Sequence, residues 1–194
     1  MEPLPVYYKS HLYMLTKNMN KVSKNVSLRA TNNIQIEGKT ILQNGVSIRG
    51  DLGQVKIGTY VVLRDEVILR PTYSKAGKKL KYIEMKIGDN VYIDRNCVIS
   101  AAKIGNNVHI GKNCIIGHRV VIYDNTKILD NSIIPADVVI PPFTCWGGSP
   151  ATCLGGLPET IEKVNSEMTK SYYKNFIGLD PDKVDGAAKA TVKK

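Results

Sequence analysis

Isoleucine recurs every six residues through much of this chain, and this period limits the possible folds more than any other feature. The unbroken series contains Ile104, Ile110, Ile116, Ile122, Ile128, Ile134 and Ile140, and the same spacing extends upstream through Ile87, Ile93 and Ile99. Six residues advance an α-helix by about 600°, which scatters the isoleucines over different faces, whereas a plain strand alternates every two residues. Neither ordinary element explains the period.

Two further positions repeat with the same period. The residue four places after the isoleucine is small or β-branched: Val91, Cys97, Val108, Cys114, Val120, Thr126, Ser132, Val138 and Thr144. The residue three places after it tolerates left-handed backbone in most hexads: Asn90, Asn96, Asn107, Asn113, Asn125, Asn131 and Asp137. We therefore expect the first two columns to point inward and the third to form corners.

One short strand and one corner per hexad predict a three-sided parallel β-helix with about 18 residues in each coil. Ile104, Ile122 and Ile140 then stack in one column at the strand spacing of about 4.8 Å. The pattern continues upstream to Ile36, which gives roughly six coils and a prism about 30 Å long. It resembles the hexapeptide-repeat proteins, and this resemblance implies a left-handed coil. The predicted fold is an all-β, left-handed parallel β-helix of hexapeptide repeats with a C-terminal α-helix.

The predicted organisation is one domain with short additions at both ends. Residues 1–33 form an N-terminal lead-in, 34–150 the β-helix, 151–178 a C-terminal helix and 179–194 a disordered tail poor in residues that can be buried. The helix is indicated by Pro158 at its start and by an apolar stripe of helical spacing: Ile161, Val164, Met168, Tyr172 and Phe176. We expect this stripe to pack against the β-helix.

The net charge of +10 is concentrated in part at a break in the repeat. Between Leu69 and Ile87 the period is lost, so we expect a loop pushed out from a corner. Its candidate contact residues for an acidic adaptor or an anionic endosomal surface are Lys75, Lys78, Lys79 and Lys81. A solvated loop that only aids solubility is the alternative. No recognition helix, RNA-binding motif or aromatic stacking platform accompanies the lysines, so nucleic acid is not an expected partner.

The segment 46–51, followed by Ile57 and Gly58, resembles the opening coils of the gamma-class carbonic anhydrases, whose zinc is held by three histidines between adjacent subunits. In this sequence the three ligand positions fall on Arg70, Arg95 and Ser100. Arginine stays protonated and serine alone is a poor ligand, so we expect neither zinc nor any other cofactor. The resemblance thus implies a site that has lost its ligands, and no catalytic residue is assigned.

Three smaller expectations concern polar residues of the repeat. His109 and His118 occupy outward positions, and without an acceptor pocket or a paired carboxylate we expect surface residues rather than general bases. Arg49 and Asp51 are expected to pair with each other or with a neighbouring coil.

From about Tyr8 to Phe176 the chain resembles the dynactin subunit 5 family. The most specific strings lie outside the repeat, at residues 20–23, 157–159 and 170–173. The resemblance implies a non-catalytic cytoplasmic, cytoskeleton-associated scaffold at the pointed end of the actin-related dynactin filament, beside dynactin subunit six, supporting dynein cargo recruitment. No apolar run is long enough to span a membrane and no signal peptide is recognised, which agrees with that location. A homotrimeric acyltransferase or carbonic anhydrase-like enzyme, and a structural β-helix with other partners, remain alternatives.

Overall fold

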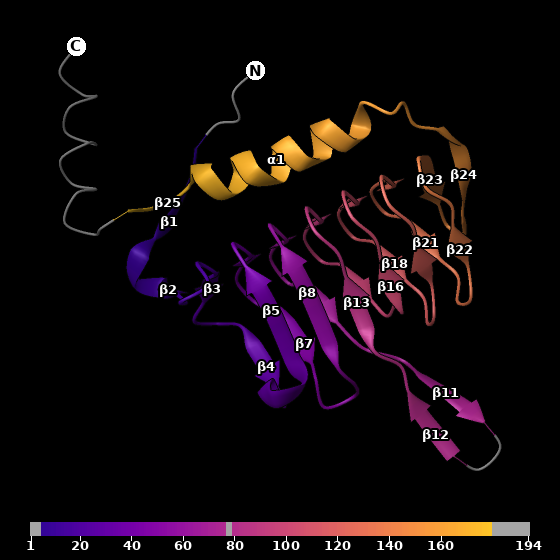
Figure 1. The fold of residues 1–194 in the computed structure, drawn as a ribbon, viewed down its shortest axis with the longest axis horizontal. Helices are drawn as coiled ribbons and strands as arrows, with labels where there is room; N and C mark the ends of the chain where they lie inside the picture. Colours follow the sequence, from indigo (N-terminus) through magenta and orange to yellow (C-terminus); the bar gives the residue numbers. More distant parts are fainter. Residues whose placement is uncertain (1–4, 77–78, 180–194) are drawn as a thin grey trace.

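Three parallel sheets wind around one aliphatic core in the computed structural model, which describes residues 5–76 and 79–179 (Figure 1). Each coil contributes one short strand to each sheet, so neighbouring strands in a sheet are about one coil apart in the sequence. The predicted left-handed parallel β-helix with a C-terminal helix is confirmed.

Sheet I is the largest and ends in an antiparallel strand on each side. Its nine strands, in spatial order, are β2 (Tyr13–Leu15), β3 (Lys21–Ser23), β6 (Ile41–Leu42), β9 (Val62–Leu63), β14 (Tyr92–Ile93), β17 (His109–Ile110), β20 (Lys127–Ile128), β23 (Thr144–Gly148) and β24 (Ala151–Gly156).

Sheets II and III have six strands each and are parallel throughout. Sheet II contains β4 (Ser27–Arg29), β7 (Ser47–Arg49), β10 (Ile68–Leu69), β15 (Val98–Ile99), β18 (Ile115–Ile116) and β21 (Ile133–Ile134). Sheet III contains β5 (Ile34–Gly38), β8 (Val55–Thr59), β13 (Met85–Ile87), β16 (Lys103–Ile104), β19 (Val121–Ile122) and β22 (Val139–Ile140).

The two inward columns form the core as expected. Every isoleucine of the six-residue series is buried, and Ile104, Ile122 and Ile140 pair coil by coil in sheet III. The small column is buried as far as Ser132, while Val138 and Thr144 in the last coil are only partly covered. Since burying one such aliphatic side chain contributes about 1.5–3 kcal/mol, the repeated rungs are the main source of stability.

The corners adopt the left-handed backbone that the asparagine column predicts. All seven predicted corner residues have φ between 54° and 64°. Their side chains also bond to one another, because Asn96 Nδ2 donates to Asn113 Oδ1 at 3.2 Å and Asn113 Nδ2 donates to Asn131 Oδ1 at 3.0 Å. Lys39, Tyr60 and Arg119 take the same backbone conformation without an asparagine, so the pattern alone did not mark these corners.

The stacked coils approach each other closely beside a glycine column at one corner. A Cβ atom on Gly88 would lie 2.9 Å from the backbone of Gly105 in the next coil, closer than real Cβ atoms come. Glycine is therefore required at position 88 because a side chain would keep the two backbones apart, and this requirement does not depend on the backbone dihedral angles of Gly88.

The first coil begins before residue 34, where the sequence analysis places the start of the β-helix. Strand β3 pairs in parallel with β6, and β4 pairs with β7. The six-residue step from Val22 to Leu28 fits the repeat, but the short 3-10 helix η2 (Thr31–Asn33) lengthens the next step, from Leu28 to Ile36, to eight residues. That insertion hides the first coil from a strict six-residue search.

After β24 the chain forms one helix, α1 (Ile161–Asn175), which runs along the β-helix from the last coils back toward the first (Figure 1). The strand β25 (Phe176–Leu179) follows and pairs in parallel with β1 (Val6–Lys9), which leads into the 3-10 helix η1 (Ser10–Leu12). Phe176 is buried with Tyr92, and Tyr172 packs against both of them, as the packing prediction requires. The predicted tail at 179–194 lies outside the described residues except for Leu179.

The face that α1 turns to the β-helix is partly polar, which corrects the predicted apolar stripe. Val164 is 56% exposed, whereas the buried residues of α1 are Asn165 and Thr169. Both side chains make hydrogen bonds, so their burial carries no penalty of unpaired polar atoms. The apolar stripe is confirmed only in the second half of the helix.

Successive turns of α1 meet successive coils at one corner column. Asn165 Nδ2 donates to the Asn107 carbonyl at 2.8 Å, and Thr169 Oγ1 bonds to Asn90 Oδ1 at 3.4 Å. The Tyr173 ring contacts the ring of Tyr60, one coil further back, with centroids 5.9 Å apart. Each step of four residues along α1 therefore corresponds to one coil. In the described part of the chain, no helix is long and apolar enough to cross a membrane.

Candidate interaction surfaces

The predicted basic loop is a two-stranded antiparallel hairpin that projects from the β-helix between sheets II and III (Figure 1). Strand β11 (Tyr73–Ala76) carries Lys75, and strand β12 (Lys79–Tyr82) carries Lys79 and Lys81. The register places Ser74 opposite Lys81 and Ala76 opposite Lys79. Lys81 is exposed, and Lys78 lies outside the described residues. The structure thus gathers Lys75, Lys79 and Lys81 on one projecting element, but as a hairpin rather than an irregular loop.

The three degenerate zinc-ligand positions do not form a binding site within this chain. Arg70 and Ser100 directly follow the paired residues Leu69 and Ile99, so they are neighbours on adjacent coils. Arg95 lies before β15, beyond the opposite end of that strand, with its Nε 3.9 Å from Asp94 Oδ1. Both arginines are exposed, while Ser100 is buried. Across the described residues, no group of three or more His, Cys, Asp or Glu side chains is placed to hold a metal ion.

The two outward histidines differ in exposure, since His109 is half-buried whereas His118 is exposed as predicted. His109 stacks on Tyr92 with ring centroids 5.1 Å apart, and burial lowers its pKa because the charged imidazolium loses solvent, with Lys127 adding to the effect. His118 Nδ1 lies 3.0 Å from Oγ1 of the buried Thr72, at the base of the hairpin. The prediction of a surface residue is therefore confirmed for His118 and corrected for His109, whose ring packs against the neighbouring coil.

The expected pair of Arg49 and Asp51 is confirmed as a bidentate contact. Arg49 Nε and Nη2 donate to the two Asp51 carboxylate oxygens, both at 2.8 Å. The same geometry links Arg119 and Asp137 on adjacent coils at 2.6 Å. Each guanidinium holds the pKa of its partner carboxyl below the usual value. These arginines and carboxylates are therefore occupied with each other.

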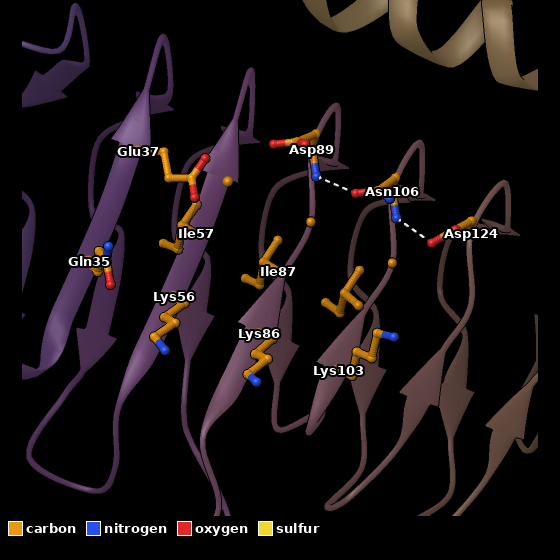
Figure 2. Close-up of a pocket in the computed structure, with 14 residues that line it drawn as sticks. Gln35, Glu37, Lys56, Ile57, Lys86, Ile87, Asp89, Lys103, Asn106 and Asp124 are labelled. Atoms are coloured by element: carbon orange, nitrogen blue, oxygen red, sulfur yellow. Dashed lines mark hydrogen bonds between the residues drawn. The ribbon is translucent and has the colours of Figure 1, made fainter.

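The outer side of sheet III carries a row of lysines that the sequence analysis did not single out. Lys56, Lys86 and Lys103 occupy one column, since Lys56 pairs with Lys86 and Lys86 with Lys103. Each directly precedes an inward isoleucine, and this was the sequence signal that could have revealed the row. Figure 2 shows the three ammonium groups following one another along a hollow of about 510 Å³.

The opposite rim of this hollow carries carboxyl and carboxamide groups: Glu37, Asp89, Asn106 and Asp124 (Figure 2). Part of this rim is bound to the backbone, because the Asp89 N–H donates to Asn106 Oδ1 at 2.8 Å and the Asn106 N–H donates to Asp124 Oδ1 at 2.7 Å. The hollow therefore lies between a positive row and a largely negative row, both parallel to the β-helix axis.

The outer side of sheet II is aliphatic instead. Its outward column holds Ile68, Val98, Ile115 and Ile133, paired coil by coil. Ile115 is 47% exposed, and Ile68 and Ile133 are nearly as accessible. The three sheets therefore differ outside although they share one core: the second half of α1 packs on part of sheet I, sheet II is aliphatic and sheet III is charged.

Comparison with known proteins gives two kinds of likeness. A family model described as dynactin subunit 5 matches residues 1–181. Dynactin subunit 5 of Dictyostelium discoideum is 42% identical over 181 residues, which cover 93% of this chain and 91% of that protein. A mitochondrial gamma carbonic anhydrase 2 of Arabidopsis thaliana is 22% identical over 139 residues, covering 72% of this chain and 49% of that protein.

The solved structures that resemble this one share its fold at low sequence identity. A hexapeptide transferase family protein from Anaplasma phagocytophilum has a TM-score of 0.63 at 18% identity, covering 80% of this chain and 89% of the other. AntD, an N-acyltransferase from Bacillus cereus, also has a TM-score of 0.63, at 17% identity, with 80% and 88% of the two chains covered. These likenesses support the β-helix and carry no inference about activity.

Proposed function

This chain belongs to the dynactin subunit 5 family, and on that basis we propose that it is a non-catalytic scaffold subunit of cytoplasmic dynactin. The proposal places it in the pointed-end complex, beside dynactin subunit six at the end of the actin-related filament, where it supports cargo recruitment by dynein. The observation that carries the proposal is the 42% identity to a dynactin subunit 5 over 93% of the chain.

The physical character of the molecule supports a scaffold role. Its stacked coils form one continuous aliphatic core, which makes a β-helix stiff along its axis. Sheets II and III begin at β4 and β5 and end at β21 and β22, strands that have a neighbour on one side only within the described residues. Such edges expose unpaired backbone groups and favour a partner that covers them. Sheet I ends in the antiparallel strands β2 and β24, which likewise have a neighbour on one side only within the described residues.

A homotrimeric enzyme of acyltransferase or carbonic anhydrase type is the alternative. Its fold is supported by the transferases of similar structure. Against it stand the residues at the carbonic anhydrase ligand positions, Arg70, Arg95 and Ser100, which cannot replace three imidazoles. The family membership favours the scaffold.

The hairpin is the proposed contact for an acidic adaptor or an endosomal surface. Lys75, Lys79 and Lys81 belong to strands that project beyond the coils, and Lys81 is exposed. Such a placement lets a large partner approach without touching the β-helix, and the positive charge favours an acidic surface. Because surface ion pairs are screened by salt, the contact should weaken as ionic strength rises.

The test is recovery of the tagged full chain from lysate of its own cells, with bound proteins identified and the size of the complex measured. The scaffold proposal predicts a megadalton assembly containing actin-related subunits. A lone trimer of about 64 kDa, three times the 21.4 kDa chain, would instead support the enzyme alternative.

The hairpin contact needs its own variant. Charge reversal of Lys75, Lys78, Lys79 and Lys81 to glutamate should reduce cargo recruitment while leaving assembly and thermal stability unchanged. The matched control reverses Lys163, an exposed residue of α1, and should recruit cargo normally. Undiminished recruitment by the hairpin variant would reject the hairpin as the contact without affecting the scaffold proposal.

A further inference from the structure

The lysine row of sheet III, formed by Lys56, Lys86 and Lys103, has an arrangement that costs energy unless something compensates it. Like charges directly opposite each other on neighbouring strands destabilise a sheet. Glu84 compensates the first pair, since its carboxylate oxygens lie 2.7 Å from Lys56 Nζ and 3.0 Å from Lys86 Nζ. The two lysines in turn hold the pKa of Glu84 below its usual value.

Lys103 has no such carboxylate partner among the described residues. Its ammonium lies 5.6 Å from the centre of the Tyr123 ring, a cation–π contact, and its side chain is exposed. Lys56 and Lys86 also remain accessible, with 44% and 57% of their side chains exposed. The row therefore carries more positive charge than Glu84 offsets, and it is open to a partner.

The geometry of the row points to a partner of a particular shape. Three rungs at the strand spacing span about 10 Å. Along one side of an α-helix, residues i, i+3 or i+4, and i+7 also span about 10 Å, at 1.5 Å per residue. We propose that the outer face of sheet III binds an α-helix of a partner protein, whose acidic residues at this spacing pair with Lys56, Lys86 and Lys103.

The chain's own helix provides the internal precedent. Asn165, Thr169 and Tyr173 of α1 meet three successive coils at one corner column of the β-helix. A helix can therefore lie along the axis of this β-helix and match it coil by coil. The proposed partner helix would make on sheet III, through charged side chains, the same coil-by-coil contact that α1 makes at this corner through amide, hydroxyl and aromatic groups.

The negative rim of the hollow favours a helix over other anionic partners. Glu37, Asp89 and Asp124 run parallel to the lysines across the hollow (Figure 2). A uniformly anionic membrane facing both rows would be repelled by the rim, whereas a helix can present acidic residues to one row and neutral or basic residues to the other. This inference concerns a surface separate from the hairpin and does not depend on the hairpin contact.

The experiment uses the purified full chain and two short alanine-rich peptides labelled for fluorescence anisotropy. The first peptide carries glutamate at i, i+4 and i+7, on one side of its helix, and the second has the same composition with glutamate at i, i+2 and i+5, on different sides. The first should bind at least about threefold more tightly, as three exposed ion pairs predict, and its affinity should fall with added salt. Equal binding of the two peptides would overturn the proposal.

Three variants locate the binding. Replacing Lys56, Lys86 and Lys103 together by glutamine should abolish the preference for the first peptide, and the fold should tolerate it, because Gln35 already occupies the next position of the same column. Lys163→Gln on α1 and Lys81→Gln on the hairpin should leave the preference unchanged. Loss of the preference in either of these controls would place the binding elsewhere and overturn the proposal. Two further results would also overturn the proposal. One is displacement of the peptide by inorganic phosphate at matched ionic strength, and the other is tighter binding of anionic phosphatidylserine vesicles than of the peptide.

Discussion

The amide of Asn165, on α1, donates a 2.8 Å hydrogen bond to the backbone carbonyl of Asn107, at a corner of the β-helix. Asn165 is 4% exposed, so water cannot replace this donor easily. The bond links the first half of the only α-helix in the described residues to the middle of the coil stack, and it places a polar side chain in a contact that was expected to be apolar.

Asn165→Ala should destabilise the fold by about 1–3 kcal/mol, since it leaves a buried carbonyl without its donor. Asn165→Asp, which keeps the size but removes the amide donor, should cost at least as much. Urea unfolding measures both changes. Lys163→Ala, on the exposed side of the helix, serves as the control and should change the unfolding free energy by less than about 0.5 kcal/mol. An unchanged free energy of unfolding in the Asn165→Asp variant would show that the hydrogen bond does not stabilise the packing of the helix.

Ile115 and Ile116 are adjacent in β18 but face opposite ways, and they offer a matched pair. Ile116 is 1% exposed and Ile115 is 47% exposed. Ile116→Ala should cost about 2–5 kcal/mol because it opens a cavity between rungs, whereas Ile115→Ala should cost less than about 1 kcal/mol. Chemical denaturation of both variants checks the assignment. Equal losses would contradict the register of sheet II.

Gly88→Ala should destabilise the fold by about 1–3 kcal/mol or more, because the new Cβ would meet the Gly105 backbone, which cannot move independently of its own coil. Gly156→Ala is the control, since the nearest atom to a Cβ there is the Phe143 carbonyl oxygen at 3.8 Å. Thermal unfolding of the two variants should separate them clearly. A harmless Gly88→Ala would mean that the coils are not as closely stacked as described.

Stability should fall as the pH rises above about 10, in part through Tyr92. Burial raises the pKa of Tyr92 to about 12, above the value near 10 in an unfolded chain. The folded state thus holds the phenolic proton more tightly, so this stabilisation is complete below pH 10 and is lost between about pH 10 and 12. Tyr13 contributes in the same direction, with its pKa also raised to about 12.

Tyr92→Phe removes one of these two groups and should make the fall in unfolding free energy between about pH 9 and pH 11 shallower. The lost hydrogen bond from Arg64 to the Tyr92 hydroxyl lowers stability at both pH values and does not mimic the change in slope. Tyr123→Phe, at a residue 43% exposed, is the control. An unchanged slope in the Tyr92 variant would contradict its burial.

The repeat predicted the fold well because each coil depends on the residue types at only a few positions of every hexad. The inward isoleucines and the left-handed asparagine corners both follow from a six-residue period that the sequence displays directly. The first coil was missed because η2 adds residues between Leu28 and Ile36, and a strict period cannot accommodate an insertion. The hairpin strands were missed because their pairing is local and separate from the repeat.

The surfaces were harder to predict than the core. The burial of Asn165 and Thr169 depends on which side of α1 meets the coils, and a stripe of apolar residues predicted a different side. The row of Lys56, Lys86 and Lys103 is visible only when coils of unequal length are aligned, because the hairpin insertion separates Lys56 from Lys86 by 30 residues. The stacking of His109 on Tyr92 was missed for the same reason, because the two rings are distant in sequence although they lie on adjacent strands.

Because α1 meets the coils one by one, the length of α1 depends on the number of coils. Adding a whole coil would lengthen the stack by about 4.8 Å and leave the core pattern intact. To keep Phe176 and the pairing of β25 with β1 in place, α1 would then have to gain about one turn, or three to four residues at 1.5 Å each. The length of α1 therefore limits the number of coils in the β-helix. A coil can be gained or lost in this architecture only together with a turn of the helix.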